Sequence, residues 1–202
     1  MPTTVKSGIT NAPFIGLTNL HIAKLKEDPA GGTATYEDMI SFPWIREAQI
    51  QPQNNQQTLY ADNMGVATAN AISRFDLTID TATMPLEYRA LLLGHSFDKG
   101  VMQVNKEDAA PYFMVAFEST KQNGKKRFVK FTKVQFTEPT EDSKTKEEQI
   151  SFNTPQLTAQ AVYRTSDGVA LIQADEEADG YEETTGANWY TTTATGTSSS
   201  GG

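Results

Sequence analysis

The chain contains no cysteine, which excludes disulfide bonds, zinc sites built from thiolates and a thiol nucleophile. It also contains no apolar run long enough to cross a membrane. Its first residues, MPTTVKSGITNAPF, lack the apolar centre of a secretory signal peptide. We therefore expect a soluble, unexported protein without a membrane partner.

Positive charge is also scarce. The chain has 17 Lys and Arg residues against 25 Asp and Glu residues, which gives a net charge of −8. Six of the acidic residues, and no Lys or Arg, lie from residue 174 to the end, so the rest of the chain has a net charge of only −2. The simplest interpretation of this acidic segment is a solvated arm. A duplex-binding protein needs clustered Lys and Arg, and no such cluster of sufficient size is present.

Motifs for catalysis and for cofactor binding are missing as well. The sequence has no GxGxxG, no GxxxxGK[ST], no HExxH, no EF-hand loop and no GxSxG. His21 lies in an apolar run and His95 directly after a predicted helix, and nothing in the sequence brings them together. Asp76 and Asp80 share one face of a predicted strand and could hold a cation or act as acid and base, although an acidic chain forms such pairs by chance. We therefore expect no enzyme, no catalytic residue, no metal and no cofactor.

Alternating apolar and polar residues dominate what is present. The apolar fraction is 38%, and Thr, Gln and Asn are abundant, a composition typical of a β-rich protein with exposed loops. We predict strands over residues 14–26, 111–118, 127–136 and 149–164. Asn123-Gly124 is the strongest hairpin signal in the chain. The segment PYFMVAFE at 111–118 is apolar on both faces, so both faces should be covered.

One helix is predicted, over residues 84–94. Thr83 is the expected N-cap, Pro85 falls in the first turn, and Gly94 supplies the left-handed residue that ends the helix. Leu86, Ala90 and Leu93 form an apolar stripe. Such a short helix most simply covers an open end or a face of a sheet.

The stretch from residue 44 to residue 80 is the organising feature of the chain. Its two ends alternate like strands, whereas residues 52–70 are polar, rich in turn-forming residues and have almost nothing to bury. A long excursion of this kind is entropically costly unless it contacts something. We therefore interpret it as a contact arm for another copy of the chain, with Leu59, Tyr60 and Met64 as its anchors.

The predicted strands around this excursion and near residue 157 have one apolar and one polar face. The polar faces contain amides, hydroxyls, carboxylates and a single arginine. Their members are Glu47, Gln49, Gln51, Arg74, Asp76, Thr78, Asp80, Gln156, Thr158 and Gln160. An ordinary solvent-facing sheet is the simple explanation of such faces.

The order of these parts resembles a known family. The segments MPLEYRALLLGH at 84–95 and YFMVAFESTKQNGKKRFVKF at 112–131 are the most specific, and a strand near ISFNTPQLTAQA and an acidic end with Trp-Tyr follow. Over residues 10 to 190 the chain resembles the major tail proteins, which are the tail tube subunits of bacteriophages with long, non-contractile tails.

This resemblance implies a mainly β fold: a β-sandwich or half-barrel with one short flanking helix and a long protruding loop or hairpin. It implies residues 1–13 as an N-terminal arm, 14–173 as the tube domain and 174–202 as an acidic C-terminal arm with a flexible tail. Inner sheets of a homohexameric ring would join into one β-barrel, and the polar faces named above would line its lumen. Rings would stack in the virion tail, with the long loop between rings.

The resemblance also implies partners. The tube would surround a tape measure protein, end at tail terminator and distal tail proteins, and let double-stranded DNA pass without specific binding. Two other classes remain open from the residues alone. A carbohydrate-binding or adhesin-like β-sandwich would use Trp44, Trp189 and Tyr190 as an exposed platform. The basic hairpin with Lys125, Lys126, Arg127, Lys130 and Lys133 could contact single-stranded nucleic acid.

Overall fold

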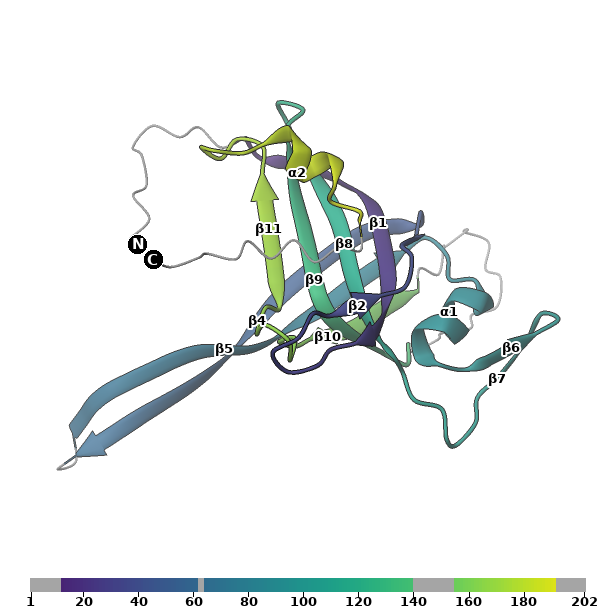
Figure 1. Ribbon diagram of the computed structural model, residues 1–202, viewed down its shortest axis with the longest axis horizontal. Helices are drawn as coiled ribbons and strands as arrows, with labels where there is room; N and C mark the ends of the chain where they lie inside the picture. Colours follow the sequence, from purple (N-terminus) through teal and green to yellow (C-terminus); the bar gives the residue numbers. More distant parts are fainter. Residues whose placement is uncertain (1–11, 62–63, 140–154, 192–202) are drawn as a thin grey trace, which may run out of the picture.

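The computed structural model describes residues 12–61, 64–139 and 155–191, with side chains for all of these except 56–61 and 64–70. Strands predominate among these residues, most of them in one large antiparallel sheet, and two short helices accompany them. The predicted fold class, a mainly β protein with a β-sandwich and a short helix, is therefore confirmed (Figure 1).

The first layer of the sandwich is built around the predicted Asn-Gly hairpin. Its strands are β1 (Phe14–Glu27), β8 (Tyr112–Lys121), β9 (Lys126–Thr137) and β11 (Leu171–Asp175), with the short β2 (Thr35–Tyr36) and β3 (Ile40–Ser41) paired to β1. Gly124 has a φ of 80°, which a glycine adopts without strain in the turn between β8 and β9. Asn19 also has a positive φ and lies where the β1–β8 register shifts between Thr18 and His21, at a bulge of β1.

The second layer contains β10 (Gln156–Ala161), β5 (Met64–Thr81) and β4 (Ile45–Ala61). It is continuous with the first layer through β9, because β11 pairs with residues 127–131 of that strand and β10 pairs with residues 134–137. The strand order is β2-β1-β8-β9-β10-β5-β4, and all of these pairs are antiparallel. Figure 1 shows the second layer crossing behind the first.

The hydrophobic core lies between the two layers. Alternate residues of β5, β8, β9 and β10 point inward, among them Leu77, Phe131 and Leu157, each at most 3% exposed. Phe131 meets Phe75 across the core in an edge-on ring contact. The outer face of β8 is also buried, as Met114 and Ala116 show, so the prediction that both faces of this strand are covered is confirmed.

Helix α1 (Leu86–Leu93) covers one end of the sandwich, as predicted, with Leu92 and Leu93 in the core. The predicted start was wrong. Pro85, not Thr83, occupies the N-cap position, and no side chain caps the helix. Pro85 has an extended ψ of 140°, so the helical hydrogen bonds begin only after it. Gly94 ends the helix with a φ of 75°, as expected, and a Cβ there would lie 2.3 Å from the Ala109 carbonyl oxygen.

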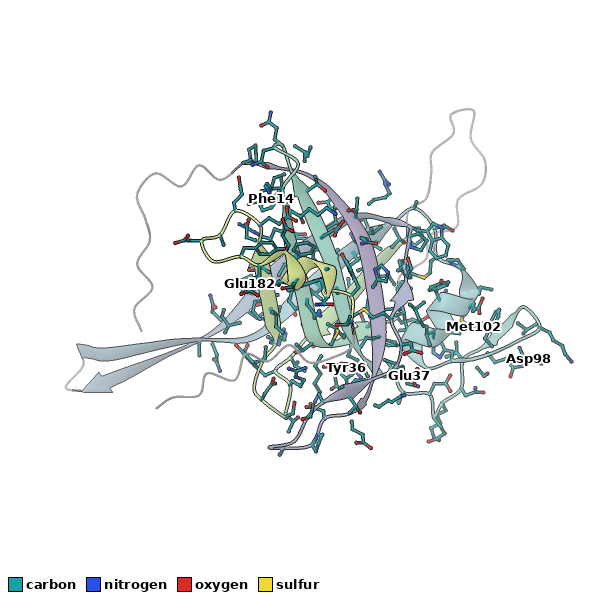
Figure 2. All side chains as sticks on the ribbon, turned by 45° about the horizontal axis from the view of Figure 1, so that its top comes forward. Phe14, Tyr36, Glu37, Asp98, Met102 and Glu182 are labelled. Atoms are coloured by element: carbon teal, nitrogen blue, oxygen red, sulfur yellow. The ribbon has the colours of Figure 1, made fainter. Side chains whose placement is uncertain are left out.

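Two hairpins extend away from the sandwich on opposite sides (Figure 1). On one side, β4 and β5 remain paired from Ile45–Thr81 out to Ala61–Met64, so the predicted excursion over 52–70 is a long β-hairpin. On the other side, β6 (Ser96–Asp98) and β7 (Val101–Gln103) form a short hairpin after α1. Figure 2 shows Asp98 and Met102 on this short hairpin, beyond the crowded side chains of the body.

The acidic segment packs on the outer face of the first layer, which differs from the expected solvated arm. It begins at the end of β11 and continues through helix α2 (Glu183–Ala187), and Trp189 after the helix is 3% exposed. The Trp189 ring packs against Phe128, and its indole N–H donates to the Val129 carbonyl oxygen at 3.3 Å. Residues 12 to 191, as far as the structure describes them, therefore belong to one folded body with two projecting hairpins.

His95 connects α1 to two acidic side chains. Its Nδ1 lies 2.8 Å from Asp108 Oδ2, its Nε2 lies 3.1 Å from Glu138 Oε2, and the Arg89 Nε donates to Glu138 Oε1 at 3.0 Å. Burial opposes protonation of the imidazole, but the two carboxylates outweigh it, so the pKa of His95 is raised above its usual 6.5. Only a protonated imidazole can donate to both carboxylates at once.

We predict that this contact stabilises the protein in a pH-dependent manner. Because the folded-state pKa is raised, the contribution is complete below pH 6.5 and is lost as the pH rises through the folded-state value. A His95→Gln variant should therefore melt at a lower temperature than the parent at pH 6, and the gap should narrow by about pH 9. Thermal melts across this range test it, and a gap that stays constant with pH contradicts it.

Candidate functional site

The polar residues singled out in the sequence form one continuous surface on the outer face of the second layer. The register places them in rows across β4, β5 and β10. The rows are Glu47–Asp80–Gln156, Gln49–Thr78–Thr158 and Gln51–Asp76–Gln160, with Arg74 beside Gln53 one step further along. We call this surface the polar face. Its side chains are exposed or half-buried, whereas Leu77, Ile79 and Leu157 of the same strands point into the core.

Hydrogen bonds run along and across these rows. The Gln156 amide nitrogen donates to Asp80 Oδ1 at 2.9 Å, and the Arg74 Nε donates to Asp76 Oδ1 at 2.9 Å. Asp76 and Asp80 lie in different rows and have different partners, so the structure does not bring them together as a carboxylate pair. No group of three or more His, Cys, Asp or Glu that could hold a metal ion occurs among the described residues.

Strand β9 extends the polar face by two residues that the sequence interpretation missed. Thr137 pairs with Thr158 and donates to its carbonyl oxygen at 3.1 Å, and Gln135 pairs with Gln160. Both alternate with the buried Val134 and Phe136. That alternation was visible in the sequence, but the neighbouring lysines of the hairpin obscured it, and the pairing with β10 was not predictable.

The edge of the second layer is unpaired in the described structure. Strand β4 pairs only with β5, so its other side presents backbone N–H and C=O groups along the strand. The same strand continues into the projecting hairpin, whose predicted anchors Leu59, Tyr60 and Met64 lie at its far end. The side chains of these three residues fall outside the described part, so their role as anchors stays a prediction.

The aromatic residues of the carbohydrate-binding alternative do not form an exposed platform. Trp189 belongs to the C-terminal segment and is buried against Phe128 of β9. Trp44 packs edge-on against Phe42 and Tyr88 at the end of the sandwich covered by α1. Tyr190 lies against the His21 ring on the outer face of the first layer. The three rings therefore serve separate packing contacts.

Most of the charged side chains in the basic hairpin form ion pairs with acidic side chains. Lys126 contacts Glu118, Arg127 contacts Asp175, and Lys133 contacts Asp28. Lys130 is 2% exposed, with its amine 4.9 Å from the centre of the Trp189 ring, and burial lowers its pKa to about 8. Lys125 is the exposed member. Because these cations are paired or buried, the hairpin offers little positive surface for a nucleic acid.

Comparison with models of protein families gave no match, and a search of curated protein sequences gave none either. None of the helices in the described part of the chain has the length and apolar character needed to span a membrane.

Proposed function

We propose that the chain is a structural, non-enzymatic tube subunit: the major tail protein of a phage with a long, non-contractile tail. Its copies form hexameric rings that stack into a tube. The tube surrounds a tape measure protein, meets terminator and distal tail proteins at its ends, and conducts DNA during ejection. The observation that supports this most is the polar face. It covers the layer whose edge strand, β4, has its outer side unpaired among the described residues and continues into a projecting hairpin.

An unpaired edge strand is a site for pairing with another chain, and closure into a barrel removes such edges. Strand β4 is long, and its exposed edge belongs to the layer with the polar face. Pairing of this edge with the next copy joins the second layers into one ring-wide sheet. The polar face then turns toward the lumen, and the first layer with its C-terminal cover forms the outside.

The chemistry of the polar face suits a channel for a polyanion. A Lys or Arg bound to a phosphate releases counterions and adds affinity, which slows passage. The polar face instead contains amides, hydroxyls, Glu47, Asp76 and Asp80, and its one arginine is paired with Asp76. Repulsion from these carboxylates extends about 8–10 Å at ordinary salt. The face therefore prevents adhesion of DNA near the wall.

In the described part of one subunit, the outer half of the hairpin, beyond Asn54 and Ile72, has β4 and β5 paired only with each other. An isolated two-stranded hairpin is marginally stable in water. Contact with the next ring stabilises it, and a head-to-tail contact of this kind generates an open stack. Negative-stain imaging of concentrated protein tests the proposal. We expect hollow rods of uniform width, and a protein that stays monomeric at high concentration, with no rods under any assembly condition, contradicts it.

A further inference from the structure

We propose that Asp76 masks Arg74, and that this single ion pair keeps the polar face from binding nucleic acid phosphates. The inference rests on the proposed function, because it assigns to one residue the low affinity that a DNA conduit requires. Arg74 is the only basic residue among the polar-face residues named above. It is therefore the one side chain there that can hold a phosphate by a charge-assisted, bidentate contact.

The geometry makes Asp76 the masking partner. Both residues lie on β5, two positions apart on the same side, and the Arg74 Nε lies 2.9 Å from Asp76 Oδ1. The Arg74 side chain is 44% exposed and the Asp76 side chain 33% exposed. An exposed pair of this kind contributes little to folding stability. Its effect is electrostatic. At distances larger than the separation of the two charged groups their fields nearly cancel, so a phosphate there is not attracted to Arg74.

Asp80 provides a matched control on the same strand and the same face. It carries the same charge, but its hydrogen-bond partner is the neutral amide of Gln156. Four residues of strand separate it from Asp76, about 13 Å at a rise of about 3.3 Å per residue. This exceeds the Debye length of about 8–10 Å. Loss of the Asp80 charge therefore changes the net charge equally and leaves Arg74 masked.

The experiment passes dilute, unassembled protein over double-stranded DNA immobilised on a column at low salt. The parent protein should flow through, and the Asp80→Asn variant, which loses one repelling carboxylate but leaves Arg74 masked, should be retained much less than Asp76→Asn. The Asp76→Asn variant should be retained and elute with salt. When the logarithm of its binding constant for a labelled duplex is plotted against the logarithm of the salt concentration, the slope should be steeper by about 1 for each arginine engaged. Asp76→Glu, which keeps the carboxylate, should flow through.

The double variant Arg74→Gln/Asp76→Asn decides whether retention acts through the arginine, and it should flow through like the parent. The inference is overturned if Asp76→Asn flows through, if Asp80→Asn is retained equally, or if the double variant is still retained. Thermal melts of each variant check that the fold persists. Imaging measures assembly separately from DNA binding. If the parent forms tubes but Asp76→Asn is not retained on DNA, only the masking proposal is overturned. If Asp76→Asn is retained but the parent forms no tubes, only the tube proposal is overturned.

Discussion

Removal of the projecting hairpin should abolish tube assembly and leave the subunit folded. The sharpest variant deletes residues 55–71 and joins Asn54 to Ile72, which are paired in the register, through an Asn-Gly turn. The remaining ladder keeps the pairing of Gln53 with Arg74 and the hydrogen bond from the Tyr163 hydroxyl to the Ile72 carbonyl oxygen at 2.8 Å. Among the residues whose side chains the structure describes, the deletion removes no buried one, and the described core on β5 begins at Phe75. Circular dichroism melts and negative-stain imaging measure the two outcomes.

A mixing experiment serves as the control for this deletion. In a head-to-tail stack, a shortened subunit still accepts the hairpin of a neighbour but offers none of its own. Small amounts of the variant should therefore shorten tubes formed by the parent protein, by ending growth at one end. Tubes formed by the shortened protein alone contradict the proposed role of the hairpin. Loss of a cooperative melt contradicts the claim that the hairpin lies outside the folding unit.

Replacement of Lys121 by Met should release the C-terminal segment from the first layer. The Lys121 side chain is fully buried, and its ammonium contacts both Asp175 and Glu177. Met keeps the apolar stem but leaves the two carboxylates without this cation. Breaking a buried pair costs about 3–5 kcal/mol. Because the carboxylates are partly exposed, we expect a loss of unfolding free energy of about 2 kcal/mol, below that range.

Trp189 reports the release directly, because it belongs to the same segment and is buried against Phe128 and Val129 of β9. The chain has two tryptophans, so a Trp44→Phe background isolates the Trp189 fluorescence. In the Lys121→Met variant this emission should shift to longer wavelength at neutral pH. Lys125→Met, a change of an exposed lysine in the same hairpin, is the matched control and should leave the emission unchanged. Equal behaviour of the two variants contradicts the role of Lys121.

Acid should produce the same release in the parent protein. Burial raises the pKa of Asp175, but hydrogen bonds, chiefly from Lys121, outweigh it and hold that pKa below 3.8. The hydrogen bond from Lys121 likewise keeps the pKa of Glu177 below 4.5. Groups with lowered folded-state pKa values stabilise the fold above their unfolded values and lose this effect as the pH falls through the folded ones. The Trp189 emission should therefore shift only below about pH 4 in the parent.

Local patterns predicted much of the fold. The two-residue period of β5 and β10 placed Leu77, Ile79 and Leu157 in the core and the intervening polar residues on one face. The Asn-Gly turn fixed the β8–β9 hairpin, and Gly94 marked the end of α1. Each of these features is determined by residues close together in the sequence, because backbone geometry and side-chain alternation allow few local conformations. The helix start was wrong because Pro85 occupies the N-cap position itself, a local detail that propensity does not resolve.

The sequence by itself determined the mainly β class, the polar and apolar sides of the strands, and the long polar excursion between two of them; that this excursion is a β-hairpin came from the structure. Only the tertiary structure decided that β10 and β11 divide one edge of β9, which aligns the polar residues of three strands into rows. It also decided that the acidic segment covers the sheet, since Lys121 meets Asp175 across 54 residues of chain. Alternation along a strand is a local property, whereas which strands become neighbours and which charges are buried depend on packing between distant segments.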